Sequence, residues 1–231
     1  MRIFQFLIDW SEVWALLIPL IVILVYKPKG PFVNWLIGYI ILSFILNTAA
    51  TLMVEYNNLF PIAMSNMGNN IFYNLHSFFM VVFLGWYIVN TRESRYKNIL
   101  KMLILGYILF VIVNFILWES VFRLSTNHFT AGSIVLLILC FTYFLQLLVS
   151  DDNKINWIRH PSFIICVGVC LYLAITFFIF LFFYPLFNNK SESVRSFAQL
   201  MMKVYQAAFI VFCILISIGL YKYKKAKETV L

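Results

Sequence analysis

Long apolar stretches alternate with short polar connections along the whole chain. A helix needs about 20 mostly apolar residues to cross the hydrocarbon core of a bilayer. The pattern therefore predicts an all-α membrane protein: a single bundle of seven transmembrane helices that forms one domain over residues 1–231. With edges placed to within about three residues, the predicted spans are 11–26, 34–55, 71–90, 100–118, 128–149, 162–184 and 198–221.

Composition supports this class and excludes others. Hydrophobic residues make up 63% of the chain and charged residues only 11%, which leaves too little polar surface for a soluble domain of this size. A transmembrane β-barrel would show short alternating segments instead of long unbroken apolar ones. The longest connection, about 56–70, is too short to hold an extramembrane catalytic domain. No small-residue cleavage site follows the first apolar stretch, so we expect it to be a retained helix.

The distribution of positive charge predicts the direction of the spans. Twelve of the 17 Lys and Arg residues lie after the first, third and fifth spans or in the tail, and five lie on the other side. Since basic loops stay inside, we expect the N-terminus outside and the C-terminus in the cytoplasm, in a bacterial inner (cytoplasmic) membrane. The tail YKYKKAK suits anionic lipid headgroups. With no soluble folding unit, the net charge of +8 does not indicate nucleic acid.

Polar side chains gather in the half of the predicted bundle that faces outward. A helix rises about 1.5 Å per residue, so distance from the basic edges gives the depth of each residue. Two interpretations stay open: hydrogen bonds of about 0.6–2 kcal/mol that join helices, or a water-accessible pocket for a small ligand. The candidate ligand-binding residues are Glu12, Asn47, Thr51, Asn74, His76, Asn114, Tyr172, Thr176, Lys203 and Gln206.

No catalytic motif is visible in the sequence. HExxH, GxSxG and phosphate-binding loops are missing, and no two histidines share a helix at metal-ligand spacing. Cys166 and Cys170 lie on one helical face without an acidic or His neighbour, so we interpret them as small buried hydrophobes rather than a metal or redox pair. We therefore predict no cofactor, no metal and no catalytic residue; whether the protein is an enzyme stays open, with the pattern against it.

A weak internal repeat suggests an alternative. Pro31 precedes Gly38 by seven residues at the start of the second span, and Pro161 precedes Gly168 by seven at the start of the sixth. Duplication of a three-helix unit around one linking helix would leave such a repeat, and several small-solute transporters have this plan.

Three motifs carry a resemblance to a known group of proteins. They are NNIFYN at 69–74, HPSFIICVGVCLY at 160–172 and GLYKYKK at 219–225. The chain loosely resembles an uncharacterised family of small bacterial seven-transmembrane proteins, although Ser162 interrupts the family's Pro-aromatic step. The resemblance implies a sensory module that works with a separate cytoplasmic signalling protein.

These observations lead to one functional hypothesis and one rival. The first is a non-enzymatic sensor or receptor-like subunit that binds a small ligand in the outer polar layer and signals to a cytoplasmic partner. The rival is a small-solute transporter of three-plus-one-plus-three type. A transporter requires a polar path that continues inward past Gln146, whereas a sensor does not.

Overall fold

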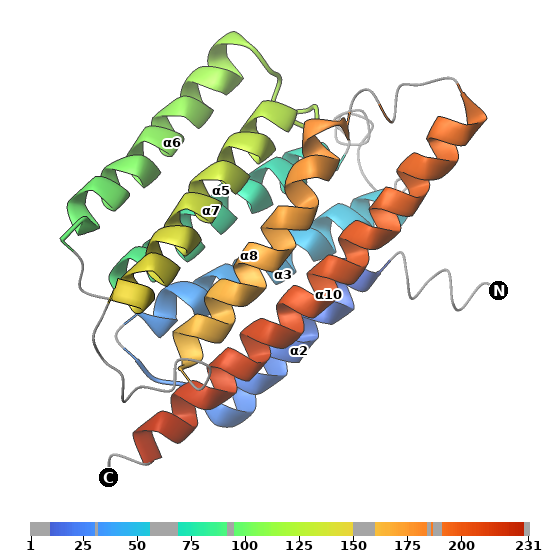
Figure 1. The fold of residues 1–231 in the computed structure, drawn as a ribbon. Coiled ribbons are helices and arrows are strands. Elements are labelled where there is room, and N and C mark those ends of the chain that lie inside the picture. Colours follow the sequence, from blue (N-terminus) through green and yellow to red (C-terminus); the bar gives the residue numbers. More distant parts are fainter. Residues whose placement is uncertain are drawn as a thin grey trace.

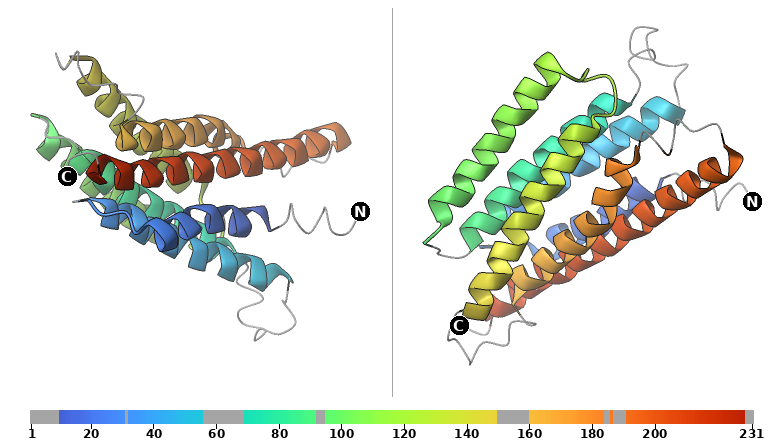
Figure 2. Two further views of the ribbon diagram at one scale, coloured as in Figure 1. Left: turned by 90° about the horizontal axis from the view of Figure 1, so that it is seen from below. Right: turned by 45° about the horizontal axis from the view of Figure 1, so that its top comes forward.

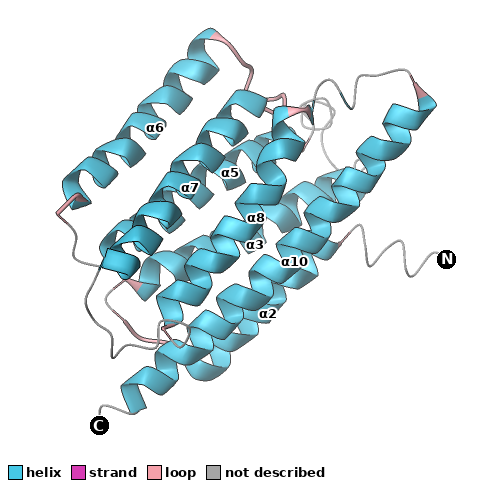
Figure 3. Cartoon of the chain, viewed as in Figure 1, coloured by secondary structure: helices cyan, strands magenta, loops and turns pink. Residues whose placement is uncertain are grey.

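The computed structural model describes residues 10–30, 32–55, 69–91, 95–149, 160–183, 186 and 191–228. Within this part of the chain, all regular structure is helical (Figures 1 and 3). The helices are α2 (Ser11–Tyr26), α3 (Val33–Glu55), α5 (Asn70–Thr91), α6 (Lys97–Leu117), α7 (Thr126–Val149), α8 (Pro161–Leu181) and α10 (Glu192–Glu228).

The predicted class is confirmed: the protein is an all-α, multi-pass integral membrane protein. Six of the helices are long and apolar enough to cross a membrane. Their positions match the predicted spans, except that α10 begins six residues earlier and ends seven later, because its amphipathic ends continue the helix. The direction of the chain in the membrane stays a prediction, and several basic residues on which it depends, such as Lys154 and Arg159, lie outside the described residues.

The first helix has the predicted bounds, and it is the shortest of the described helices. Helix α2 has 16 residues, a length of about 24 Å at 1.5 Å per residue, whereas the hydrocarbon core is about 30 Å thick. The helix ends because Lys27 adopts a left-handed conformation with φ of 44°, and Pro28 follows. A seventh complete span therefore stays a prediction.

Six helices form a ring in chain order, and the seventh lies outside it. Helix α2 packs on α3 and α10, α3 on α5, α5 on α7, α7 on α8, and α8 on α10. Helix α6 packs mainly against the outer side of α5 and α7, at the edge of the bundle (Figure 1; Figure 2, right). Exposed apolar side chains such as Leu105, Leu109 and Ile116 cover α6, as expected for contact with lipid.

Two glycines let neighbouring helices of the ring approach closely. A Cβ atom added to Gly38 on α3 would lie 2.7 Å from the Phe83 ring on α5. One added to Gly168 on α8 would lie 2.9 Å from Cβ of Leu215 on α10. These are the glycines of the predicted repeat, and they lie at corresponding helix contacts, α3 with α5 and α8 with α10. Pro31, which precedes Gly38 in that repeat, lies outside the described residues.

A hydrogen-bonded cluster closes the end of the bundle near the C-terminus. The hydroxyl oxygens of Tyr87 on α5 and Tyr223 on α10 are 2.8 Å apart. The Ser162 hydroxyl at the start of α8 lies 2.6 Å from the same Tyr223 oxygen. Tyr87 and Ser162 are both fully buried. We call these three residues the tyrosine cluster; its polar groups satisfy one another across three helices.

Candidate ligand pocket

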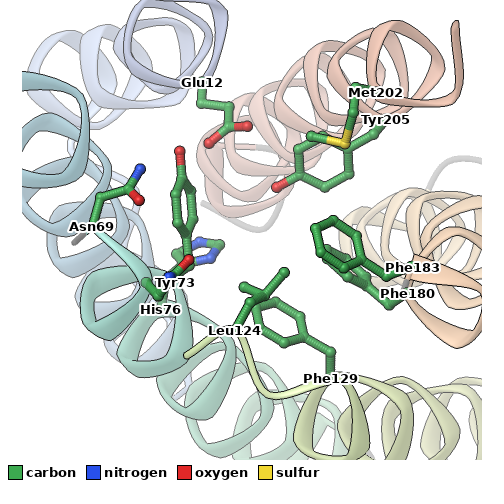
Figure 4. Close-up of a pocket in the computed structure, with 11 residues that line it drawn as sticks. Glu12, Asn69, Tyr73, His76, Leu124, Phe129, Phe180, Phe183, Met202 and Tyr205 are labelled. Carbon is green, nitrogen blue, oxygen red and sulfur yellow. The ribbon is translucent and has the colours of Figure 1, made fainter. Parts of the chain in front are cut away.

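A cavity of about 260 Å³ lies at the other end of the ring, among residues of α2, α5, α7, α8 and α10. It sits near the start of α2, α5 and α7 and near the end of α8, beside Met202 and Tyr205 of α10, so side chains from all five elements converge (Figure 4). The residues that line it are Glu12, Asn69, Asn70, Tyr73, His76, Leu124, Phe129, Phe180, Phe183, Met202 and Tyr205.

The Glu12 carboxylate is the one acidic group among the described lining residues. It is only 9% exposed. Figure 4 shows it directed into the cavity, with the Tyr73 and Tyr205 hydroxyls turned toward it. Among the residues that the structure describes, none forms a hydrogen bond or ion pair with Glu12, and none of those lining the pocket is Lys or Arg. Its place in the first turn of α2 is where the helix dipole favours negative charge.

His76 contributes a second polar group to the pocket. Its side chain is 5% exposed, and its Nε2 atom has no hydrogen-bond partner in the described part of the chain. The imidazole ring packs against Tyr39 on α3 and Phe209 on α10, with ring-centre separations of 6.0 and 6.4 Å. A buried nitrogen without a partner is costly. Nε2 has no accessible surface, so a group in the cavity reaches it only if the ring turns.

Aromatic rings build the wall opposite α2. Phe129 and Phe180 are stacked with centres 4.3 Å apart. Phe180 in turn meets Tyr205 edge-on at 5.9 Å and stacks with Phe183 at 6.4 Å. Most of the pocket surface is apolar, with the polar groups on the side of α2 and α5 (Figure 4).

Below His76, the centre of the ring is filled by packed aromatic side chains. Tyr39, Phe209 and Phe212 are each 1% exposed. Phe212 lies 6.2 Å from the Tyr39 ring and stacks at 5.0 Å on Tyr172, a residue of the predicted polar layer. We call these four residues the aromatic floor. It separates the pocket from the tyrosine cluster at the other end.

Asn74 points away from the pocket and holds the connection between α6 and α7. Its amide nitrogen donates to the carbonyl oxygens of Val121 and Arg123, each at 2.8 Å. Its side-chain oxygen accepts from the backbone N–H of Ser125 at 3.1 Å. Both N–H donors and the side-chain oxygen of this buried amide therefore have partners within the fold.

Asn114, near the end of α6, holds the same connection from the other side. Its amide nitrogen donates to the Glu119 carboxylate at 2.8 Å and lies 3.2 Å from the Ser125 hydroxyl. That hydroxyl also donates to Glu119. Sequence reasoning missed Glu119 and Ser125; the one acidic residue in the connection after Asn114 was the available signal. A separate cavity of about 340 Å³ borders Asn114 between α6 and α7, with Leu181 of α8 beside it.

Three further candidates use their polar atoms on their own helices. The Asn47 amide donates to the Ser43 carbonyl and the Thr51 hydroxyl to the Asn47 carbonyl, both at 2.9 Å. The Thr176 hydroxyl lies 3.5 Å from the Leu173 carbonyl oxygen. Such bonds to a preceding turn satisfy the side chain without another helix.

The two remaining candidates lie on α10 outside the cavity. Lys203 is exposed on the outer face of the helix, and Gln206 is partly buried beside the lining residue Tyr205. Of the ten predicted residues, the structure thus brings Glu12 and His76 together in the pocket, with Tyr172 in the floor.

The walls of the pocket were not predicted from the sequence. Tyr73, Phe180 and Met202 were not among the candidate residues. With 25 Phe and 13 Tyr residues in the chain, aromatic identity alone cannot mark the few that face a cavity. In the described part of the chain, no three His, Cys, Asp or Glu residues gather as a metal site requires.

Comparison of the chain with protein-family models, curated proteins and solved structures gives no match.

Proposed function

We propose that this membrane protein is a non-enzymatic, receptor-like subunit that binds a small ligand in the pocket and passes a helix shift to a cytoplasmic partner. The observation that carries the proposal is the pocket itself: five helices enclose a cavity with a buried carboxylate that has no described partner. A ligand that contacts all five can favour one arrangement of them over another.

The aromatic floor supports reception rather than transport. A transported solute needs a route through the bundle, yet Tyr39, Phe209 and Phe212 are each 1% exposed beneath the pocket. The tyrosine cluster occupies the opposite end. Together they favour a ligand that enters and leaves by the same side, and the charge distribution predicts that this side is the exterior. The short connections indicate that a response requires a separate cytoplasmic protein.

Cysteine labelling in native membranes tests the proposal. Met202→Cys places a thiol in the pocket, whereas the natural Cys213, 1% exposed, lies beside the floor residue Phe212. A charged, membrane-impermeant maleimide added to either side, with the labelled cysteine located by mass spectrometry, reports water at each depth. The buried Cys166 serves as an internal control for unfolding.

We expect labelling of Met202→Cys from the outside only and no labelling of Cys213. Labelling of Cys213 together with Met202→Cys, while Cys166 stays unlabelled, would show a continuous path and favour the three-plus-one-plus-three transporter. No labelling of Met202→Cys would show that the polar side chains only join helices, and the proposal would fail.

A further inference from the structure

We propose that the pocket selects a small organic cation: a protonated primary amine that carries an apolar, preferably aromatic, body. This inference rests on the binding role proposed above and specifies the chemical class of the ligand. It follows from three features of the described lining residues, namely the sign of the charge, the aromatic wall and the position of the remaining polar atoms.

The charge that the pocket offers to a ligand is negative. Glu12 is 9% exposed, and none of the described lining residues is Lys or Arg. A buried carboxylate is costly unless a positive group or several donors accompany it. A cationic ligand supplies that partner, whereas an anionic ligand would be repelled and a neutral apolar ligand would leave the carboxylate unpaired.

The aromatic wall suits a cation that is organic rather than a metal ion. Phe129, Phe180, Phe183 and Tyr205 form a continuous set of ring contacts in the pocket. Ring faces attract ammonium groups, and they also bury hydrocarbon. A metal ion needs several oxygen, nitrogen or sulfur ligands, and no group of three acidic, His or Cys residues exists in the described part of the chain.

The remaining polar atoms favour a primary over a quaternary ammonium. A primary ammonium has three N–H donors. The Glu12 carboxylate and the Tyr73 hydroxyl can accept them from one side of the cavity. A quaternary ammonium has no N–H group and would leave these oxygens without a hydrogen-bond donor.

The cavity volume limits the size of the ligand. Pockets that hold drug-sized ligands measure about 300–1,000 Å³, and this one measures about 260 Å³. One ring with a short aminoalkyl chain suits such a space.

Matched probes test this class directly. Phenethylamine carries the amine, 2-phenylethanol is its neutral counterpart, 3-phenylpropanoate its anionic one, and phenyltrimethylammonium a quaternary one. Binding to the full-length protein in lipid nanodiscs is measured by isothermal titration calorimetry. We expect phenethylamine to bind at least tenfold more tightly than each of the other three.

Variants connect the selectivity to the pocket. Loss of one partner of a buried charge pair costs about 2–5 kcal/mol, so Glu12→Gln should weaken phenethylamine roughly 30-fold or more. Phe180→Leu should weaken it several-fold through the loss of ring contact. Glu192→Gln is the matched control, since it removes the same charge from an exposed site at the start of α10. Gel filtration and melting temperature check that each variant folds.

The outcomes separate this inference from the proposed function. Equal binding of amine and alcohol, or amine binding that survives Glu12→Gln, overturns the cation class while leaving the pocket as a binding site. Absence of binding for all four probes also overturns the inference, and labelling of Met202→Cys then decides separately whether the pocket exists. If Glu192→Gln weakens amine binding as much as Glu12→Gln does, surface charge explains the effect, and the inference is overturned as well.

Discussion

The two ends of the ring treat buried polar groups in opposite ways. At the C-terminal end, the hydroxyls of Tyr87, Ser162 and Tyr223 pair with one another at 2.6–2.8 Å. At the pocket end, Glu12 and the Nε2 atom of His76 are also buried, but no described residue pairs with them. A polar group that satisfies itself inside the fold contributes stability, whereas one that does not is available to a ligand.

Polar side chains at a similar depth therefore differ in role, according to whether the fold supplies a partner. Asn74 shows this within the pocket end itself. It lies two residues from His76, yet it makes three hydrogen bonds to the α6–α7 connection and faces away from the cavity.

The largest effect on stability should come from Asn74→Ala. The change leaves two carbonyls and one N–H of the connection without their partner, and unpaired groups cost about 1–3 kcal/mol each when buried. We expect a loss of about 3 kcal/mol, seen as a melting temperature lower by roughly 6–12 °C in detergent.

Asn47→Ala is the matched control for this change. Both amides are 2% exposed, but Asn47 donates only to the preceding turn of its own helix. Its replacement should cost less than about 1 kcal/mol. Equal losses for the two variants would mean that burial alone, and not the number of partners, decides the cost.

Tyr223→Phe should have the second largest effect. It removes the hydroxyl shared by Tyr87 and Ser162 and leaves two fully buried oxygens unpaired, at about 2 kcal/mol in total. Tyr221→Phe removes the same atom from an exposed ring two residues away, so its melting temperature should stay at the wild-type value. If Tyr223→Phe left the melting temperature unchanged, the contrast between the two ends would not hold.

The fold was predictable because one signal dominates it. Apolar length determines a membrane helix, so the predicted edges of six spans, that of α2 included, agree with the structure to within about three residues. The exception is α10, whose polar ends continue the helix on both sides of the predicted span 198–221. The position of α6 outside the ring was not predictable, because each helix is apolar on nearly all sides and periodicity cannot show which side meets protein.

The site was predictable only in part, for a related reason. Depth along a span follows from counting residues, and depth placed Glu12 and His76 at the right level. Rotation about the helix axis does not follow from counting. Asn74 and His76 are two residues apart, so they face different directions; one bonds to a loop and the other lines the pocket.

Glu12→Gln should change stability in the opposite direction to the preceding variants. A buried carboxylate without a partner is unfavourable in the empty protein, so its neutral isostere should raise stability by about 1 kcal/mol, a few degrees in melting temperature. Glu55→Gln, on an exposed site at the end of α3, should leave the melting temperature unchanged. Destabilisation by Glu12→Gln as large as that of Tyr223→Phe would show that Glu12 is a structural group like those of the tyrosine cluster.

The smallest effect should come from Lys203→Ala, which tests whether the pocket charge is isolated. Lys203 belongs to the predicted polar layer, but it is exposed on α10 and does not line the cavity. Its replacement should change stability by less than about 0.5 kcal/mol and phenethylamine affinity by less than about twofold, because solvent and salt screen exposed charges. If affinity instead rose more than about fivefold at physiological salt, Lys203 would be balancing Glu12 across the rim. The carboxylate would then have a partner after all, and the difference between the two ends would be one of distance rather than of pairing.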